Sequence, residues 1–110
     1  MKIAVASTAR DESSMVSPRP GRARNYLIFN ENGHLLKTLS NPFSRGGGGA
    51  GFGVAKMLAD KHVDVVVGGR FGDKMAEALA QRGMAYRTFE GSVREAIDWL
   101  LSSFSGDDPG

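Results

Sequence analysis

Short apolar runs separated by polar turns divide the first part of the chain into a strand, a long loop and a hairpin. Residues 2–7 are nearly all apolar, which is typical of a central strand covered on both faces. Residues 26–29 and 35–39 are also strand-like, and the Asn-Gly pair between them predicts a hairpin with a tight primed turn, in which both central residues have positive φ. Residues 8–24 contain few bulky apolar side chains and predict an irregular loop, which we expect to be a mobile flap that orders on a ligand.

Three amphipathic helices are predicted after the hairpin. Apolar residues recur at three- and four-residue spacing in three segments, which are residues 51–62, 73–82 and 92–104. Gly83 predicts the end of the second helix, because glycine readily adopts the left-handed conformation that stops a helix. Ser92 and Glu95 have the spacing of a capping box and predict the start of the third helix. Each helix has one apolar face, which must pack against a sheet.

Strand-like runs between these helices complete the predicted fold. Residues 63–68 and 85–89 read as strands, so the order is strand, hairpin, helix, strand, helix, strand, helix. A short hairpin is antiparallel, whereas strand–helix–strand crossovers are right-handed and parallel. The chain is therefore predicted to be an α/β protein with a mixed five-stranded sheet of order 3-2-1-4-5, resembling the ribonuclease H architecture, flanked by three helices on both faces. We expect one domain over residues 1–104 and a disordered tail over residues 105–110.

Composition bounds the class of protein. The chain has 110 residues, 41% of them hydrophobic and 24% charged, which suits one compact domain with a core between helices and sheet. It has no cysteine, which excludes disulfides, cysteinyl iron–sulfur clusters and structural zinc of the Cys type. No apolar run approaches the roughly 20 residues that span a bilayer, and the apolar start is too short for a secretory signal. We therefore expect a cytoplasmic protein that has no membrane partner.

Charge is distributed unevenly along the chain. The net charge of +2 is too small to predict bulk binding of nucleic acid, so we expect no nucleic-acid partner. Residues 1–45 carry seven Lys and Arg against three Asp and Glu, whereas residues 46–110 carry seven against nine. Five of the nine arginines fall in predicted loops, and these are Arg10, Arg19, Arg22, Arg24 and Arg45. A guanidinium presents a fork of donors to oxyanions and is weakly hydrated enough to contact large soft anions.

A glycine-rich stretch over residues 44–53 precedes the first predicted helix and holds six of the 15 glycines. Glycine lets backbone N–H groups approach a ligand, and the start of a helix adds free N–H groups and the positive end of its dipole. The stretch is therefore predicted to be an anion cradle. Such a cradle can hold a phosphate, a dinucleotide, a carboxylate or a larger inorganic anion.

Several enzymatic chemistries lack their residues. A dinucleotide site requires an acidic residue at the end of the next strand, where this chain has Gly68-Gly69. A P-loop requires Gly-Lys-Ser/Thr at the end of the glycine run, and this motif is absent from the sequence. Residues 3–6 carry none of the carboxylates with which ribonuclease-H-like nucleases hold magnesium. His34 and His62 are the only histidines, and no serine of the first loop lies near either in sequence. We therefore expect a binding protein without catalytic residues.

The ordered set of motifs resembles the dinitrogenase iron–molybdenum cofactor biosynthesis family over about residues 2–104. The resemblance rests on SPRPGRA at 17–23, NP at 41–42, GGGAG at 47–51 and DVVVGGRFG at 64–72. The family includes the cofactor carriers NifX and NafY, the C-terminal domain of NifB, and a small orange protein that holds a molybdenum–copper sulfide cluster. The resemblance implies a ribonuclease-H-like fold and a role in binding or carrying a metal–sulfur cluster.

The sequence departs from the family pattern at two positions where members commonly have histidine. Arg19-Pro20 stands in place of His-Phe, and Arg45 stands just before the glycine run. Imidazole bonds metals and guanidinium in practice does not. Within the family, these changes indicate a protein similar to the orange protein, which captures an anionic molybdenum–copper sulfide cluster, or a related molybdenum-containing cluster, without a covalent bond. Arginines and backbone N–H groups would hold the anion, and Met15 and Phe71 would shield it.

The predicted site combines the end of the first strand, the loop after it, the glycine stretch and the crossover that follows residues 63–68. Its residues are Ser7, Thr8, Arg10, Met15, Arg19, Gly21, Arg22, Asn41, Arg45, Gly46, Gly47, Gly48, Gly49, Gly69, Arg70, Phe71 and Gly72. No protein metal ligand is expected, and the chain is expected to be a monomer. Two other functions stay open at this point: a nucleotide- or phosphate-binding protein that uses the same glycines, and an interaction module that docks a partner ATPase or scaffold.

Overall fold

The predicted order of helices and strands is confirmed by the computed structural model, which describes residues 1–45 and 49–105. The elements are β1 (Lys2–Ser7), the 3-10 helix η1 (Pro20–Arg22), β2 (Asn25–Asn30), β3 (Leu35–Ser40), α1 (Ala50–Asp60), β4 (Val65–Gly68), α2 (Asp73–Gln81), β5 (Ala85–Thr88) and α3 (Val93–Ser105). Ser105 was predicted to begin the tail, yet it is the last residue of α3. The rest of the predicted tail, residues 106–110, lies outside the described residues.

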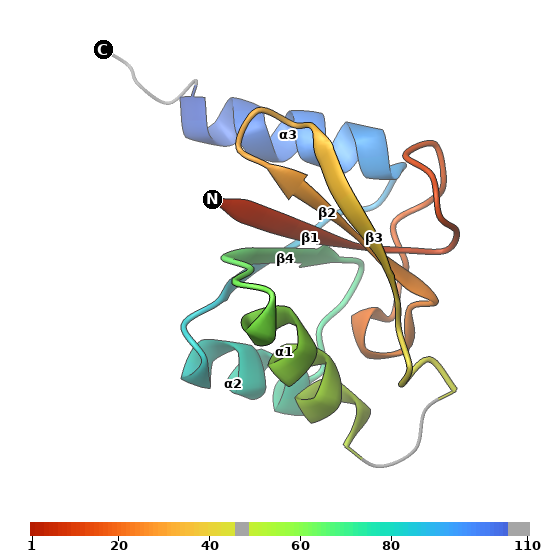
Figure 1. The fold of residues 1–110 in the computed structure, drawn as a ribbon, viewed down its shortest axis with the longest axis vertical. Helices are drawn as coiled ribbons and strands as arrows, with labels where there is room; N and C mark the ends of the chain where they lie inside the picture. The colour runs from red at the N-terminus through yellow and green to blue at the C-terminus, as the bar shows by residue number, and fades with distance from the viewer. Residues whose placement is uncertain (46–48, 106–110) are drawn as a thin grey trace.

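The five strands form one mixed sheet of order β3-β2-β1-β4-β5, as predicted. β1 pairs antiparallel with β2 and parallel with β4, so it lies at the centre of the sheet. α1 and α2 cover one face of the sheet and α3 covers the other (Figure 1). The carboxyl ends of β1 and β4 therefore meet at one edge, and the loops that follow them emerge together.

Alternating side chains of the central strand supply two separate cores. Ala4 and Ala6 belong to the cluster under α1 and α2, whereas Ile3 and Val5 belong to the cluster under α3. All four side chains are fully buried, because successive side chains of a strand point to opposite faces and both faces are covered. This explains why residues 2–7 read as a continuous apolar run. None of the helices in the described part of the chain is long and apolar enough to cross a membrane.

The hairpin between β2 and β3 forms as predicted, but its turn is not of the primed type. Gly33 has φ 81°, and His62 is the only non-glycine residue with positive φ in the described ranges. The N–H of Gly33 donates to the carbonyl of Asn30 at 3.0 Å, which makes a turn followed by a left-handed glycine. The carboxamide oxygen of Asn30 accepts hydrogen bonds from the N–H groups of Asn32 and His34. We attribute the different turn to this side chain, because it fixes the backbone locally.

The loop over residues 8–24 is held along much of its length. The N–H of Ser17 donates to Ala6 of β1 at 2.8 Å, and the N–H of Gly69 donates to Ser17 at 2.9 Å. The N–H of Val16 donates to Gly91 at 2.9 Å. The loop therefore lies between the ends of β1 and β4 and the start of α3. Its ordering by a ligand stays a prediction, but these contacts do not need one.

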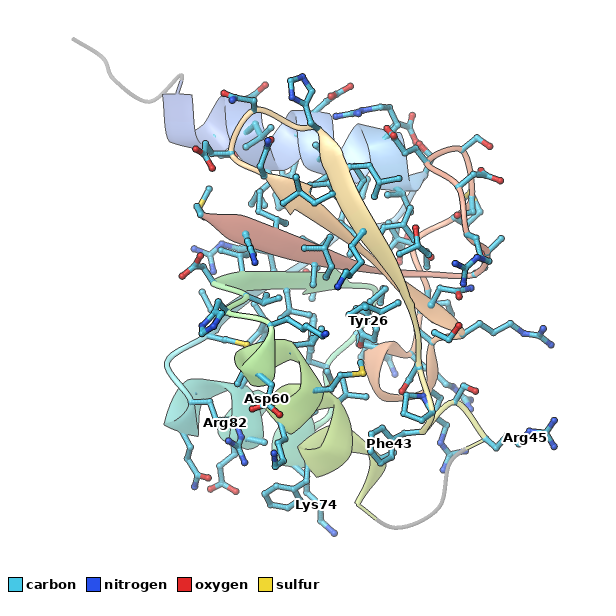
Figure 2. All side chains as sticks on the ribbon, viewed as in Figure 1. Tyr26, Phe43, Arg45, Asp60, Lys74 and Arg82 are labelled. Atoms are coloured by element: carbon cyan, nitrogen blue, oxygen red, sulfur yellow. The ribbon has the colours of Figure 1, made fainter. Side chains whose placement is uncertain are left out.

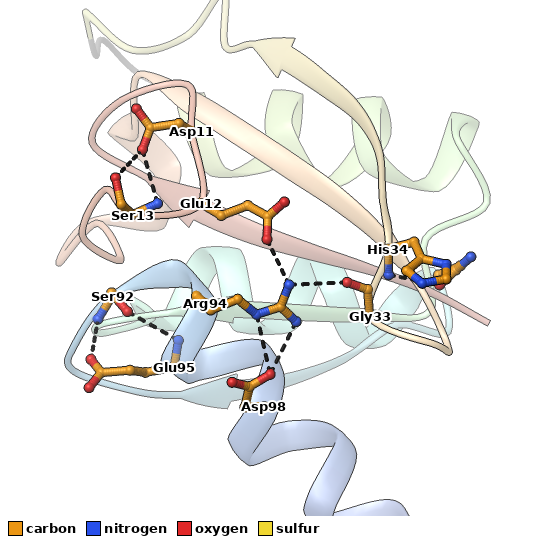
Figure 3. Close-up of polar contacts among 10 residues, drawn as sticks. Asp11, Glu12, Ser13, Gly33, His34, Ser92, Arg94, Glu95 and Asp98 are labelled. Atoms are coloured by element: carbon orange, nitrogen blue, oxygen red, sulfur yellow. Dashed lines mark hydrogen bonds and ion pairs between the residues drawn. The ribbon is translucent and has the colours of Figure 1, made fainter.

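Polar contacts at the start of α3 fix the other side of this loop (Figure 3). The capping box is confirmed: the N–H of Ser92 donates to the carboxylate of Glu95 at 2.8 Å, and the N–H of Glu95 donates to the hydroxyl of Ser92 at 3.1 Å. Arg94 forms an ion pair with Glu12 at 2.6 Å. α3 thus anchors the first half of the loop, while the second half faces the sheet edge.

Candidate functional site

A cleft of about 510 Å³ lies where the chain leaves β1 and β4. The loop after β1, the loop after β4 and the first turns of α1 and α2 surround it. Its lining residues are Pro18, Arg19, Pro20, Gly21, Arg22, Gly49, Ala50, Gly51, Arg70, Gly72, Asp73, Lys74 and Met75. We call this the main cleft. Its position, outside the carboxyl ends of neighbouring parallel strands, is the usual place for a ligand in α/β sheets.

Two helices begin at the main cleft, and each is preceded by a glycine. Gly49 is the N-cap of α1 and has φ 85°, and Gly72 is the N-cap of α2. Neither N-cap supplies a side-chain hydrogen bond. An α-helix leaves its first N–H groups without partners inside the helix, and its dipole is positive at this end. Both helix starts therefore favour an anion in the main cleft.

Cations outnumber carboxylates along the cleft. Its described lining has four cations, Arg19, Arg22, Arg70 and Lys74, and one carboxylate, that of Asp73. The side chains of these four cations form no hydrogen bond or ion pair with any residue that the structure describes. Lys74 lies in the first turn of α2, beside the start of α1 (Figure 2). The cleft therefore carries positive charge that no carboxylate of the described chain neutralises by direct contact.

The glycines near the cleft have two different uses. A Cβ at Gly72 would meet nothing within 4 Å, and the same is true at Gly49. A Cβ at Gly69, however, would lie 2.6 Å from the backbone of Pro18, and one at Gly68 would lie 2.2 Å from the ring of Pro20. Gly68 and Gly69 thus let two loops pack together, and the N–H of Gly69 already donates to Ser17. Gly49 and Gly72 leave their space to the cleft.

Tyr26 of β2 holds η1, which lines the main cleft, against the sheet. Its side chain is fully buried, and its hydroxyl donates a hydrogen bond to the carbonyl of Pro20, the first residue of η1. Burial raises the pKa of Tyr26, so the hydroxyl stays protonated and keeps donating. Figure 2 shows Tyr26 under the sheet beside η1. This contact fixes the loop that presents Arg19 and Arg22.

The predicted site is divided between separate surfaces. Six of its residues line the main cleft, and these are Arg19, Gly21, Arg22, Gly49, Arg70 and Gly72. Arg10, Asn41 and Arg45 instead line a second hollow of about 630 Å³, together with Arg22, Arg24, Asn25, Ser40 and Ser44. We call this second hollow the arginine hollow. Arg22 is the lining residue that the two share. Gly46, Gly47 and Gly48 lie outside the described residues.

Other predicted residues line neither hollow. Ser7 is fully buried and its hydroxyl donates to the carbonyl of Ala9. Thr8 is exposed and its hydroxyl accepts a hydrogen bond from the N–H of Met15. Met15 is 52% exposed and lines a third hollow of about 380 Å³, which shares Pro18, Arg19 and Arg70 with the main cleft.

Phe71, which we predicted to shield the ligand together with Met15, does not line the main cleft either. The ring of Phe71 packs on that of Tyr86, with the centroids 4.6 Å apart. Gly69 lines the third hollow with Met15. The methionine that lines the main cleft is Met75 and not Met15.

Sequence reasoning missed the first turn of α2. Asp73, Lys74 and Met75 all line the main cleft, and Met75 also belongs to the core cluster under α1 and α2. Met75 does both, because its side chain is 5% exposed and packs under Gly51. The pattern available in the sequence was Gly72 directly before a helix, since a glycine N-cap leaves the helix start open to an anion.

Hydrogen-bond donors outnumber carboxylates along the main cleft. No group of three His, Cys, Asp or Glu side chains comes together within residues 1–45 and 49–105. His34 lies on the β2–β3 hairpin, and His62 follows the end of α1 that is remote from the cleft. Donors of this kind fit an anion better than a bare metal ion.

Comparison with known proteins assigns the family. The chain matches the dinitrogenase iron–molybdenum cofactor family over residues 1–103 and belongs to it. Its structure is similar to that of the apo form of the orange protein from Desulfovibrio gigas, with a TM-score of 0.86, 27% identity, and coverage of 93% of this chain and 88% of that chain. It is also similar to an NMR structure from Thermotoga that was assigned to NifB and to the DUF35 family, with a TM-score of 0.73, 31% identity, and coverage of 96% and 88%. No curated protein matches the chain.

Proposed function

We propose that this protein binds and carries an anionic molybdenum-containing metal–sulfur cluster of the molybdenum–copper sulfide type, without a covalent bond between protein and metal. Membership of the family and similarity to the orange protein support a role in cofactor binding or carriage. The observation that carries the finer proposal is that two helix N-termini and four cations, which have no ion-pair partner among the described residues, lie at the main cleft. The cluster is the cargo in this account.

The side chains of the cleft favour an anion with sulfide at its surface over a hard oxyanion. Arginine is weakly hydrated and can lie against a large soft anion, and helix N–H groups can donate to its surface atoms. The thioether of Met75 adds a polarisable apolar contact. The cleft volume of about 510 Å³ lies within the range of about 300–1,000 Å³ that is usual for small-molecule sites.

Carriage and not catalysis is the role that the cleft residues support. Neither histidine of the chain lies at the cleft, and among its described lining residues only Asp73 has a carboxylate. A paired acid and base is therefore not assembled there. Docking of a partner ATPase or scaffold that receives the cargo is a further part of the proposal.

Reconstitution with tetrathiomolybdate and copper tests this function. We expect the apo protein to retain molybdenum through desalting and to develop visible absorption. The double variant Arg19→Ala/Arg70→Ala should retain several-fold less, because it removes two unpaired guanidiniums of the cleft. The matched variant Arg82→Ala/Arg87→Ala has the same net charge and changes neither hollow, so it should behave like the wild type.

Equal retention by both double variants would contradict the proposed cleft. A thermal-shift series with ATP, inorganic phosphate and tetrathiomolybdate plus copper distinguishes the phosphate-binding alternative. Only the true ligand should raise the melting temperature strongly, because stabilisation grows with ligand concentration relative to the dissociation constant. A large shift with ATP and none with thiomolybdate would reject the cluster.

A further inference from the structure

The arginine hollow concentrates positive charge on a surface separate from most of the main cleft. Its described lining includes four arginines and no acidic residue, and the arginines are Arg10, Arg22, Arg24 and Arg45. They come from the loop after β1, from the residue before β2 and from the connection between β3 and α1. Like charges so close together repel one another, so a partner of opposite charge would be bound favourably there.

No carboxylate neutralises these arginines within the described chain. The ion pairs of the structure lie elsewhere, between the N-terminus and Glu31, within α1, and around Arg94. Arg10 donates only to neutral oxygens, those of Asn25 at 3.4 Å and Ser40 at 3.3 Å. The side chains of the other three have no hydrogen-bond or ion-pair partner among the residues described. Their donors therefore stay available.

The buried side chain of Asn41 lines the hollow and already has hydrogen-bond partners within the protein. Asn41 is 4% exposed, and its amide donates to the carbonyls of Ala23 at 2.8 Å and Gly21 at 3.3 Å. Its side-chain oxygen accepts from the N–H of Phe43 at 2.9 Å. Asn41 thus ties the end of β3 to the loop before β2. It shapes the hollow but has little donor capacity left for a ligand.

We propose that the arginine hollow is a docking surface for an acidic segment of a partner protein. All four arginines of the hollow are exposed, and Arg45 extends away from the body of the protein (Figure 2). Several spaced carboxylates match this arrangement better than one small anion, for which a focused set of buried donors is needed. The described lining contains no aromatic residue on which the bases of a single-stranded nucleic acid could stack.

Fluorescence anisotropy with a labelled peptide of alternating Asp and Glu residues tests this docking surface. We expect binding that weakens as salt rises, because exposed charges are screened. Arg24→Glu should weaken binding about tenfold, since it replaces a guanidinium of the hollow by a carboxylate that repels the acidic peptide. Arg24→Lys should retain most of the affinity. Arg82→Glu, which makes the same change of net charge outside the hollow, should lose less than about twofold.

Three results would overturn the proposal. Equal losses for Arg24→Glu and Arg82→Glu would show that only the overall charge matters. Tighter binding of a labelled single-stranded oligonucleotide, with the same dependence on Arg24, would assign the surface to nucleic acid. Displacement of the peptide by inorganic phosphate at low millimolar concentration would assign it to a small oxyanion. Uptake of tetrathiomolybdate and copper by Arg24→Glu is measured in parallel, because unchanged uptake separates this surface from the main cleft.

Discussion

Arg94 connects three segments that lie far apart in the sequence. Its guanidinium pairs with Glu12 at 2.6 Å and with Asp98 at 3.1 Å, and it donates to the carbonyl of Gly33 at 3.2 Å. It also lies over the ring of Phe29, 5.7 Å from the centroid. One side chain of α3 therefore holds the loop after β1 and the β2–β3 hairpin in place (Figure 3).

Removal of this side chain should cost more stability than removal of an isolated surface ion pair. Arg94→Ala is expected to lower the free energy of unfolding by about 1–2 kcal/mol, because ion pair, hydrogen bond and cation–π contact are lost together from a half-exposed position. Lys56→Ala breaks only the exposed pair with Asp60 and should cost at most about 0.5 kcal/mol. Urea unfolding measures both, and equal costs would show that Arg94 is not an anchor.

The loop also contains a local contact that responds to pH. The hydroxyl and the N–H of Ser13 donate to the carboxylate of Asp11, and they hold the pKa of Asp11 below its usual 3.8. A lowered pKa favours the folded state above the usual value, and this contribution disappears as the pH falls through the lowered value. Ser13→Ala should therefore raise the pKa of Asp11 toward 3.8. The hydroxyl of Ser14 donates to the backbone carbonyl of Asp11 and not to its carboxylate. Ser14→Ala should therefore leave the pKa of Asp11 nearly unchanged in an NMR titration.

At the scale of elements, α1 and α2 end in the same way with different residues. In both, the second residue after the last helical one has positive φ, and it is His62 with φ 63° after α1 and Gly83 with φ 77° after α2. The N–H of Val63 donates to Leu58 at 3.1 Å, and the N–H of Met84 donates to Leu79 at 2.9 Å. Both are Schellman motifs, a helix end in which a left-handed residue is required.

Glycine at the first of these ends should stabilise the protein. His62→Gly is expected to raise the free energy of unfolding by about 0.5–1 kcal/mol, because a side chain makes the left-handed conformation costly. Gly83→Ala should lower it by about 1 kcal/mol for the same reason. Thermal unfolding of the two variants beside the wild type checks the pair. A destabilised His62→Gly would mean that the imidazole makes a contribution that outweighs backbone strain.

Element types could be predicted because each depends on local spacing. The all-apolar residues 2–7, the capping box at Ser92 and the stop at Gly83 are short-range patterns with a direct physical cause. The turn of the hairpin was predicted wrongly, because the side chain of Asn30 competes with the preference of the Asn-Gly pair. The hydrogen bonds of a single side chain leave no periodic pattern in the sequence, so they are harder to predict than a helix or a strand.

At the scale of the whole molecule, the order of the sheet followed from the connections between strands. That order correctly brought the ends of β1 and β4 together. It could not show how the loop over residues 8–24 divides the predicted site. The loop is fixed by contacts with residues 69 and 91–94, which are distant in sequence. The result is that Arg19 and Arg45, which we had predicted to share one site, line separate hollows.

A single substitution at Gly72 tests the central claim most directly. Gly72 lies at the main cleft, has an ordinary φ of −73°, and has open space where a Cβ would go. Gly72→Asp places a carboxylate among the cleft cations, while an Asp N-cap favours α2 by a few tenths of a kcal/mol. Gly72→Ser caps the helix without adding charge and is the matched control.

The measurement is the molybdenum retained per protein after reconstitution with tetrathiomolybdate and copper, together with the melting temperature of each apo protein. Our account predicts that Gly72→Asp melts no lower than the wild type and retains several-fold less molybdenum. Gly72→Ser should retain nearly as much as the wild type. Full retention by a well-folded Gly72→Asp would contradict the account, because an anion in this cleft cannot be indifferent to a carboxylate placed inside it.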